Sequence, residues 1–154
     1  MATPYSDVYD SFMLVIKDYL LIDLYEASES DFEEYLLGFL INAIVEFHNC
    51  SQDLTERNDT TLTFSITLTD TEIFILAQFM VKHWLTKEVN DILEFKNLLT
   101  DRDFKHHSEA QNLKQKQNYL SIVRETTDAY AQTYSYINNF PWENWADGNF
   151  GYGG

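Results

Sequence analysis

The residues from Thr69 to Leu85 read TDTEIFILAQFMVKHWL, and this stretch decides the fold. It opens with a capping box, because Thr69 and Glu72 have the spacing at which each side chain can bond the backbone amide of the other. Such a cap stabilises a helix by about 1 kcal/mol and fixes where it begins. Apolar residues then cover most of the circumference, apart from a thin polar seam of Thr71, Gln78 and Lys82. A helix of this kind is buried, so we predict the central helix of a helical domain.

Helical spacing predicts two helices before this one. A short helix over residues 6–16 follows Ser6 and Asp7, either of which can cap it. Residues 17–25 are apolar without a clear period, and we expect a break there. A second helix begins at Ser28 or Ser30 and ends near residue 48. Gly38 inside it costs about 1 kcal/mol relative to Ala, a cost that the close approach of another helix would explain.

Two helices are also predicted after the central one. Residues 86–99 form one of them, and a long helix begins near Ser108. In the long helix, apolar or uncharged residues recur at intervals of three, four and seven, which predicts one face toward the bundle. This face consists of Leu113, Leu120, Val123, Thr127, Tyr130, Tyr134 and Ile137, whereas Gln111, Lys114, Gln117 and Arg124 should face water.

The period changes to two between Thr61 and Leu68, where apolar residues alternate with Thr and Ser. Alternation over eight residues indicates a strand, and no second comparable strand occurs in the chain. A lone strand has unpaired edges, so this segment either packs on its own domain or pairs with another chain. The residues expected to make subunit–subunit contacts are Leu62, Phe64 and Ile66.

The last 17 residues, 138–154, are rich in Asn, Asp and Gly but carry large aromatic side chains. Each would return about 1.5–3 kcal/mol if buried. We interpret this segment as an extended arm that becomes ordered on a partner; the alternatives are a frayed end and an arm that folds back on its own domain. The residues expected to bind the partner are Phe140, Trp142, Trp145, Phe150 and Tyr152.

These patterns predict a mainly α fold. It is a helical bundle of about four to five helices, with one extended or β segment at about 61–68 and an extended C-terminal arm. We divide the chain into a helical domain over 1–137 and an aromatic arm over 138–154.

The charge of the chain is strongly negative, with 25 acidic and 10 basic residues in 154. Residues 1–81 hold 15 acidic and 2 basic residues, whereas residues 82–124 hold 6 acidic and 8 basic ones. This balance argues against binding nucleic acid through phosphate contacts. The acidity serves solubility alone, or it lets an acidic face of one copy meet a more basic patch on the next copy, head to tail.

Motifs for catalysis or cofactor binding are missing from the sequence. His106 and His107 are adjacent and would point in different directions on a helix, and His48 and Cys50 have no partner motif. We therefore expect no enzyme activity, no catalytic or metal-binding residues and no cofactor. The N-terminus does not resemble a signal peptide and no segment has the length of a membrane span, so we expect a protein without membrane contacts that is made in a cytoplasm.

Several segments resemble small structural proteins of tailed bacteriophages and prophages of Gram-positive hosts. The main one is the run from Leu68 to Leu85, with the pattern LTD-x-EI-x-ILA-x-x-MV-x-x-WL. Three shorter segments also resemble that group: DVYDSF over 7–12, DFK-x-x-S-x-A-x-x-L over 103–113 and YSY over 134–136. On these residues the chain is similar to the head–tail adaptor (connector, head-completion) proteins.

The resemblance implies a mostly helical subunit that forms a homo-oligomeric ring, commonly of twelve copies, in the neck of a virion. The ring would join the portal protein to the next neck or tail ring, and DNA would pass through its channel without sequence-specific binding. An acidic channel wall would repel DNA phosphates, although the acidity could equally lie on the outer rim.

Two alternatives remain. One is a stopper or tail-terminator ring protein of the same neck. The other is an acidic inhibitor that mimics DNA, which would need carboxylates at phosphate-like spacing on one exposed face.

Overall fold

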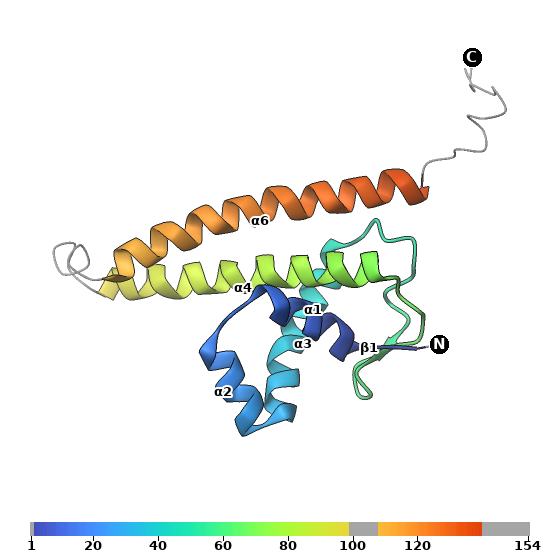
Figure 1. Cartoon of the computed structure of the whole chain (residues 1–154), viewed down its shortest axis with the longest axis horizontal. Coiled ribbons are helices and arrows are strands. Elements are labelled where there is room, and N and C mark those ends of the chain that lie inside the picture. The colour runs from blue at the N-terminus through green and yellow to red at the C-terminus, as the bar shows by residue number, and fades with distance from the viewer. Residues whose placement is uncertain (1, 99–107, 140–154) are drawn as a thin grey trace, which may run out of the picture.

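The computed structural model describes residues 2–98 and 108–139 of the chain (Figure 1). Two long antiparallel helices, α4 (Asp70–Leu98) and α6 (Ser108–Asn139), lie side by side. Three shorter helices lie on the other side of α4. They are α1 (Tyr5–Val15), α2 (Tyr19–Ala27) and α3 (Glu29–Glu46). Two of them, α1 and α3, pack on α4, and α2 packs on α3. The prediction of a mainly α bundle with a minor β segment is confirmed.

Helix α4 begins where the capping box predicts. The Thr69 amide donates to Glu72 Oε2 at 2.7 Å, and the Glu72 amide donates to Thr69 Oγ1 at 3.3 Å. The helix predicted over residues 86–99 is not a separate element, because α4 continues without a break through Leu98. Thr86 fits inside the helix by donating from its hydroxyl to the Lys82 carbonyl, one turn earlier, at 2.8 Å.

The core surrounds the first two-thirds of α4. Its buried members from α4 include Leu76, Ala77, Met80, Val81 and Leu85, all at most 1% exposed. Helix α3 contributes the apolar face predicted from its spacing. Helix α6 follows its predicted face at five of the seven positions, whereas Tyr130 and Ile137 are exposed and Ala131 is buried instead.

The break predicted over residues 17–25 is wrong, because most of these residues belong to helix α2. The Asp18 carboxylate accepts from the Leu20 amide at 2.8 Å and so caps a helix that the apolar composition concealed. This helix packs mainly against α3, and Leu21 is its one buried residue among those whose side chains are described.

Two further expectations about caps and glycine have different outcomes. Ser28 caps α3 as predicted, accepting from the Asp31 amide at 3.2 Å. The N-cap of α1 is Pro4, so neither Ser6 nor Asp7 caps that helix. A Cβ at Gly38 would meet nothing within 4 Å, so the predicted close helix approach there is wrong.

The predicted eight-residue strand is a two-residue strand in a small antiparallel sheet. Strand β3 (Thr63–Phe64) lies between β1 (Thr3–Pro4) and β2 (Arg57–Asn58), in the order β1-β3-β2. Leu62, the residue before β3, has a φ of 51°, in the left-handed region. The extended conformation of β3 therefore does not include Leu62. The expectation of unpaired strand edges is wrong, because β3 has a neighbour from its own chain on both sides.

Candidate partner-binding surfaces

The residues predicted to contact other chains fall into two groups. Phe64 is fully buried in the core of its own chain, with its ring 4.8 Å from that of Tyr5, so the fold does not present it to another subunit. Leu62 and Ile66 are partly buried against the same core, and a contact through them stays a prediction. The arm residues Phe140, Trp142, Trp145, Phe150 and Tyr152 lie outside the described residues.

A buried carboxylate joins three parts of the chain at the start of α4. Glu72 is 1% exposed, and its Oε2 accepts from the amide and the hydroxyl of Thr69 at 2.7 and 3.0 Å. Its Oε1 accepts from the hydroxyl of Tyr134 on α6 at 2.5 Å and from that of Ser51 at 3.4 Å. These donors offset the cost of removing the charge from water, so the cluster fastens α6 and the loop after α3 to α4.

The hydroxyl of Tyr134 is fully used in this cluster. It donates to Glu72 and accepts from the Ser51 amide at 3.1 Å. Burial, together with the hydrogen bond to Glu72, raises the pKa of Tyr134 to about 12. Burial also raises the pKa of the neighbouring Cys50 thiol, which disfavours the thiolate form. The hydrogen bonds of Glu72 and Tyr134 within the chain give this cluster a structural role.

A second polar cluster links α3, α4 and α6. Lys82 pairs with Glu46, and its Nζ lies 3.6 Å from Asp128 Oδ1. His83 Nε2 lies 2.8 Å from Glu46 Oε2, an ion-pair distance when the imidazole is protonated, although the two atoms are not aligned as a hydrogen bond. His83 thus lies at a contact between helices of its own chain, where it orients Glu46.

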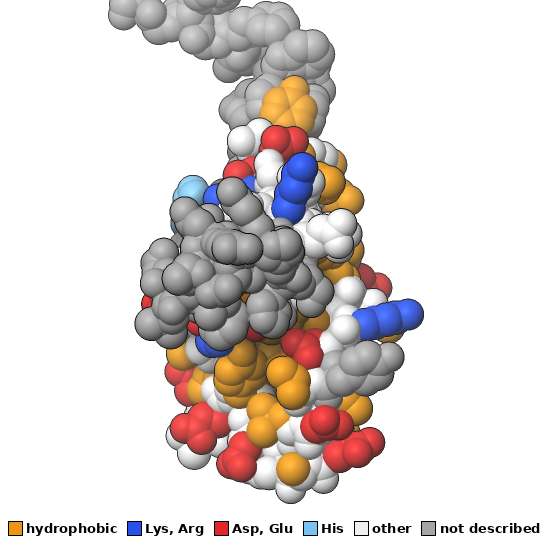
Figure 2. All heavy atoms as spheres, turned by 90° about the vertical axis from the view of Figure 1, so that its left-hand side faces the viewer, with side chains coloured by type: hydrophobic (Ala, Val, Ile, Leu, Met, Phe, Trp, Pro, Cys, Tyr) orange, Lys and Arg blue, Asp and Glu red, His pale blue; other side chains and the backbone are white. Residues whose placement is uncertain are grey.

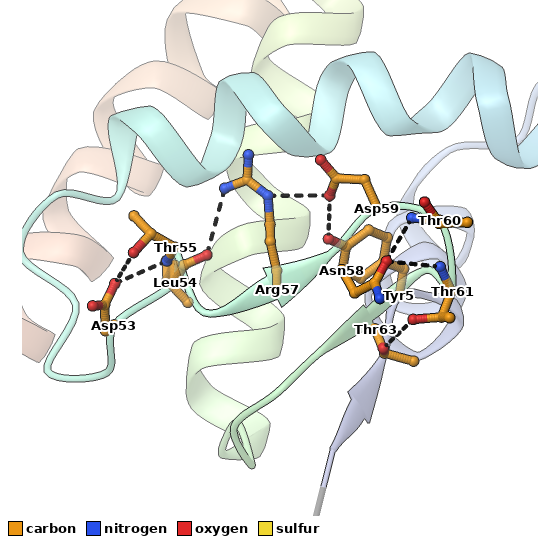
Figure 3. A network of polar contacts seen from close by, with 10 residues as sticks. All are labelled: Tyr5, Asp53, Leu54, Thr55, Arg57, Asn58, Asp59, Thr60, Thr61 and Thr63. Carbon is orange, nitrogen blue, oxygen red and sulfur yellow. Dashed lines mark hydrogen bonds and ion pairs between the residues drawn. The ribbon is translucent and has the colours of Figure 1, made fainter.

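The loop between α3 and β3 is held by a third set of polar contacts (Figure 3). The Asp59 carboxylate accepts from the Tyr5 hydroxyl at 2.6 Å and from Arg57 Nε at 3.1 Å. The Asn58 side chain accepts from the amides of Thr60 and Thr61 at 2.9 and 3.2 Å, which forms the turn before Leu62. The Arg57 side chain therefore makes its contacts within its own loop, and these polar side chains of the loop bond to groups of the same chain.

A groove between α1, α2 and α3 is lined by carboxylates that make no hydrogen bond or ion pair to another described residue. It has a volume of about 340 Å³, and it is lined by Ser6, Tyr9, Asp10, Met13, Ile22, Tyr25, Glu29, Phe32 and Glu33. Tyr9 is 3% exposed, and its hydroxyl has no hydrogen-bond partner among the described residues. Figure 2 shows hydrophobic side chains with acidic ones around them on the lower part of one face of the molecule. A buried polar atom without a partner is uncommon in a folded protein and calls for an explanation.

The outer face of α6 is a second uncovered surface. Positions 119, 122, 126, 129, 133 and 136 recur at intervals of three and four, and they carry Tyr, Ile, Thr, Ala, Thr and Tyr. All six are exposed, with Ile122 at 57% and Tyr136 at 56%. Arg124 and Asp128 fall on other sides of the helix, whereas Glu125 borders this set of positions. We call this set of six positions the α6 outer face.

Two kinds of feature were not found in the described part of the chain. No group of three or more His, Cys, Asp or Glu residues comes close enough to hold a metal ion. No helix there combines the length and the apolar character needed to cross a bilayer.

Comparison with family models, with curated proteins and with solved structures found no match to this chain.

Proposed function

We propose that this chain is a structural subunit of a tailed-phage neck, a head–tail adaptor that forms a ring between the portal protein and the tail. The helical architecture is of the kind that the resemblance implies. The observation that carries the proposal is the α6 outer face, a long uncharged helix face that its own chain leaves uncovered. A structural protein that joins two others needs such a surface.

The spacing on the α6 outer face is suited to a helical partner. Intervals of three and four bring each position to the same side of a helix, which is the arrangement of a packing seam. Exposed apolar side chains that form a continuous surface are typical of protein–protein contacts. Tyr119 and Ile122 contribute the largest apolar side chains to its first half, at 40% and 57% exposure.

The aromatic arm follows this face in the sequence. Helix α6 ends at Asn139, and Phe140 and Trp142 follow within three residues. We propose that the α6 outer face and the arm 138–154 together dock on the portal protein, and that aromatic side chains provide the main anchors. The acidic surface is consistent with a channel wall that does not retain DNA. In this proposal the protein resides in the virion neck after assembly in the host cytoplasm.

The test is whether altered protein can join DNA-filled heads. Deletion of residues 138–154 and the substitution Ile122→Glu should each abolish joining, because one removes the anchors and the other buries a charge in the contact. Ser121→Glu adds the same charge to the preceding residue, off the α6 outer face, and should join as well as the wild type. If the deleted protein joins heads at wild-type yield, the docking arm is excluded. If Ile122→Glu also does so, the α6 outer face is excluded.

A further inference from the structure

We propose that the groove between α1, α2 and α3 binds the guanidinium group of Arg124 from a second copy of this chain. This inference deepens the proposed function and rests on it, since it supplies the contact between neighbouring subunits of the ring. The α6 outer face and the arm remain free for the portal protein.

The groove has the chemistry of a site for a cation on a long side chain. Carboxylates of Asp10, Glu29 and Glu33 line it, and none of them has a hydrogen bond or ion pair to another described residue. Phe32 and Tyr25 form an aromatic pair in its wall, with ring centroids 5.2 Å apart. A volume of about 340 Å³ is at the lower end of the ~300–1,000 Å³ typical of small-ligand sites, which suits one side chain better than a whole helix.

The hydroxyl of Tyr9 provides the observation that is independent of the acidic residues. It is buried and has no partner in the described structure, yet Tyr9 lines the groove. Burial and the nearby carboxylates of Glu33 and Asp59 raise the pKa of this hydroxyl, so it stays neutral. A neutral hydroxyl oxygen can accept a hydrogen bond from an N–H donor that enters the groove.

Arginine fits this set of groups better than lysine does. Its planar guanidinium can bond a carboxylate through two N–H groups and still donate to the Tyr9 oxygen. The same plane can lie against an aromatic ring such as Tyr25, which an ammonium group does less well.

Arg124 is the arginine that the described structure leaves available. It is exposed on α6 and has no hydrogen bond or ion pair to another described residue. It ends a run, residues 111–124, that holds three basic residues and no acidic one. In that run Lys116 is already paired with Glu88 of α4 at 2.7 Å. Arg57, the other described arginine, is bonded to Asp59.

The contact has to join two copies. In Figure 1, α4 lies between α6 on one side and α1, α2 and α3 on the other. Arg124 therefore cannot reach the groove of its own chain. A contact between two different surfaces of identical chains is head-to-tail, and such contacts close into rings when the rotation between copies permits.

Sedimentation equilibrium of the full-length chain tests the contact through two charge reversals. Arg124→Glu and Glu33→Arg should each lower the self-association constant by at least about tenfold, because each places like charges in the groove. An equimolar mixture of the two variants should associate again. In one orientation, Arg124 of the Glu33→Arg variant enters the unchanged groove of the Arg124→Glu variant and forms the native pair. In the other orientation, the glutamate at position 124 meets the arginine at position 33, so the charges are again opposite. Rescue by mixing excludes the explanation that either variant has failed to fold.

Lys114→Glu is the matched control, since it makes the same change of charge elsewhere on the polar side of α6. It should lower the association constant by less than about threefold. Tyr9→Phe should weaken self-association without lowering the melting temperature, a result that a purely structural hydroxyl would not give. An unrescued mixture, or an effect of Lys114→Glu equal to that of Arg124→Glu, would overturn the inference.

The outcomes also separate this inference from the proposed function. A wild-type chain that assembles, with variants that the mixture does not rescue, contradicts the groove contact alone. Association with rescue, combined with normal joining of heads by the chain lacking 138–154 and by Ile122→Glu, contradicts the docking proposal alone. A wild-type chain that stays monomeric at every concentration contradicts the groove contact.

Discussion

Tyr134 and Tyr9 are both almost completely buried, at 5% and 3% exposure, but their hydroxyl groups have opposite surroundings. The Tyr134 hydroxyl donates to Glu72 and accepts from the backbone of Ser51. Tyr9 lines the groove between α1, α2 and α3, and its hydroxyl has no partner among the described residues. Both hydroxyls have a raised pKa, mainly because burial disfavours the phenolate.

This difference distinguishes a hydroxyl that stabilises the fold, that of Tyr134, from one that is available to another molecule, that of Tyr9. A buried polar group whose bonds are all made within the chain stabilises the fold, and its loss leaves several partners unsatisfied. A buried polar group with no partner does not stabilise the isolated chain, and it gains a bond only when another molecule supplies one. The substitutions below test this distinction in order of expected effect.

Glu72→Ala should have the largest effect on stability. It removes half of the capping box and leaves the hydroxyls of Tyr134 and Ser51 without their acceptor. We expect a loss of about 3 kcal/mol in the free energy of unfolding, measured by urea denaturation. Glu94→Ala, at an exposed position of the same helix, should change it by less than about 0.5 kcal/mol. Equal effects of the two substitutions would show that the Glu72 cluster does not fasten the fold.

Tyr134→Phe should have the next largest effect. It removes a hydrogen bond to a charged acceptor and leaves the packing of the ring unchanged, so we expect a loss of about 2 kcal/mol in the free energy of unfolding. Tyr119→Phe, at an exposed position of α6, is the control and should have little effect. If Tyr134→Phe is no more damaging than this control, the hydroxyl contributes nothing to the fold.

The same tyrosine predicts a dependence of stability on alkaline pH. Its pKa is raised to about 12 in the folded chain from the ordinary tyrosine value of about 10, so its contribution is complete below about pH 10 and disappears as the pH rises toward 12. In this range Tyr134→Phe should reduce the slope of unfolding free energy against pH by up to about 1.4 kcal/mol per pH unit. Identical slopes for the variant and the wild type would contradict the shifted pKa.

Substitution of Gly38 should increase stability, in contrast to the losses above. It lies inside α3, and a Cβ there would have no neighbour within 4 Å. Gly38→Ala should therefore raise the free energy of unfolding by about 0.5–1 kcal/mol, because alanine loses less backbone freedom on folding. A loss of stability would mean that another helix approaches this position after all.

Tyr9→Phe should have the smallest effect on the isolated chain. The hydroxyl makes no hydrogen bond in the described structure, so its removal should leave the free energy of unfolding within about 0.5 kcal/mol of the wild type. The comparison with Tyr134→Phe is direct, since both remove one buried oxygen. A loss as large as that of Tyr134→Phe would show that Tyr9 has a partner within its own chain.

Local signals in the sequence predicted much of the fold. The capping box at Thr69 and the cap at Ser28 each involve residues within one turn, and both were correct. The spacing along α6 was correct at five of its seven positions. Helix α2 was missed because its apolar residues show no periodic face, and it contacts little besides α3. The cap at Asp18 was the one local signal that could have revealed it.

Contacts between distant residues could not be predicted in the same way. Glu72 and Tyr134 are 62 residues apart, and no pattern in either segment pairs them. The partners of the strand at Thr63 come from the N-terminus and from a polar loop, where two-residue strands leave no alternation to detect. The groove around Tyr9 likewise depends on the packing of three helices.

The most direct test of the proposed assembly is the mass of the purified full-length chain in native mass spectrometry and sedimentation, at low and at physiological salt. We expect one discrete closed oligomer, weakened by salt because charges join its subunits. A monomer of 18.1 kDa at every concentration and salt condition would contradict it.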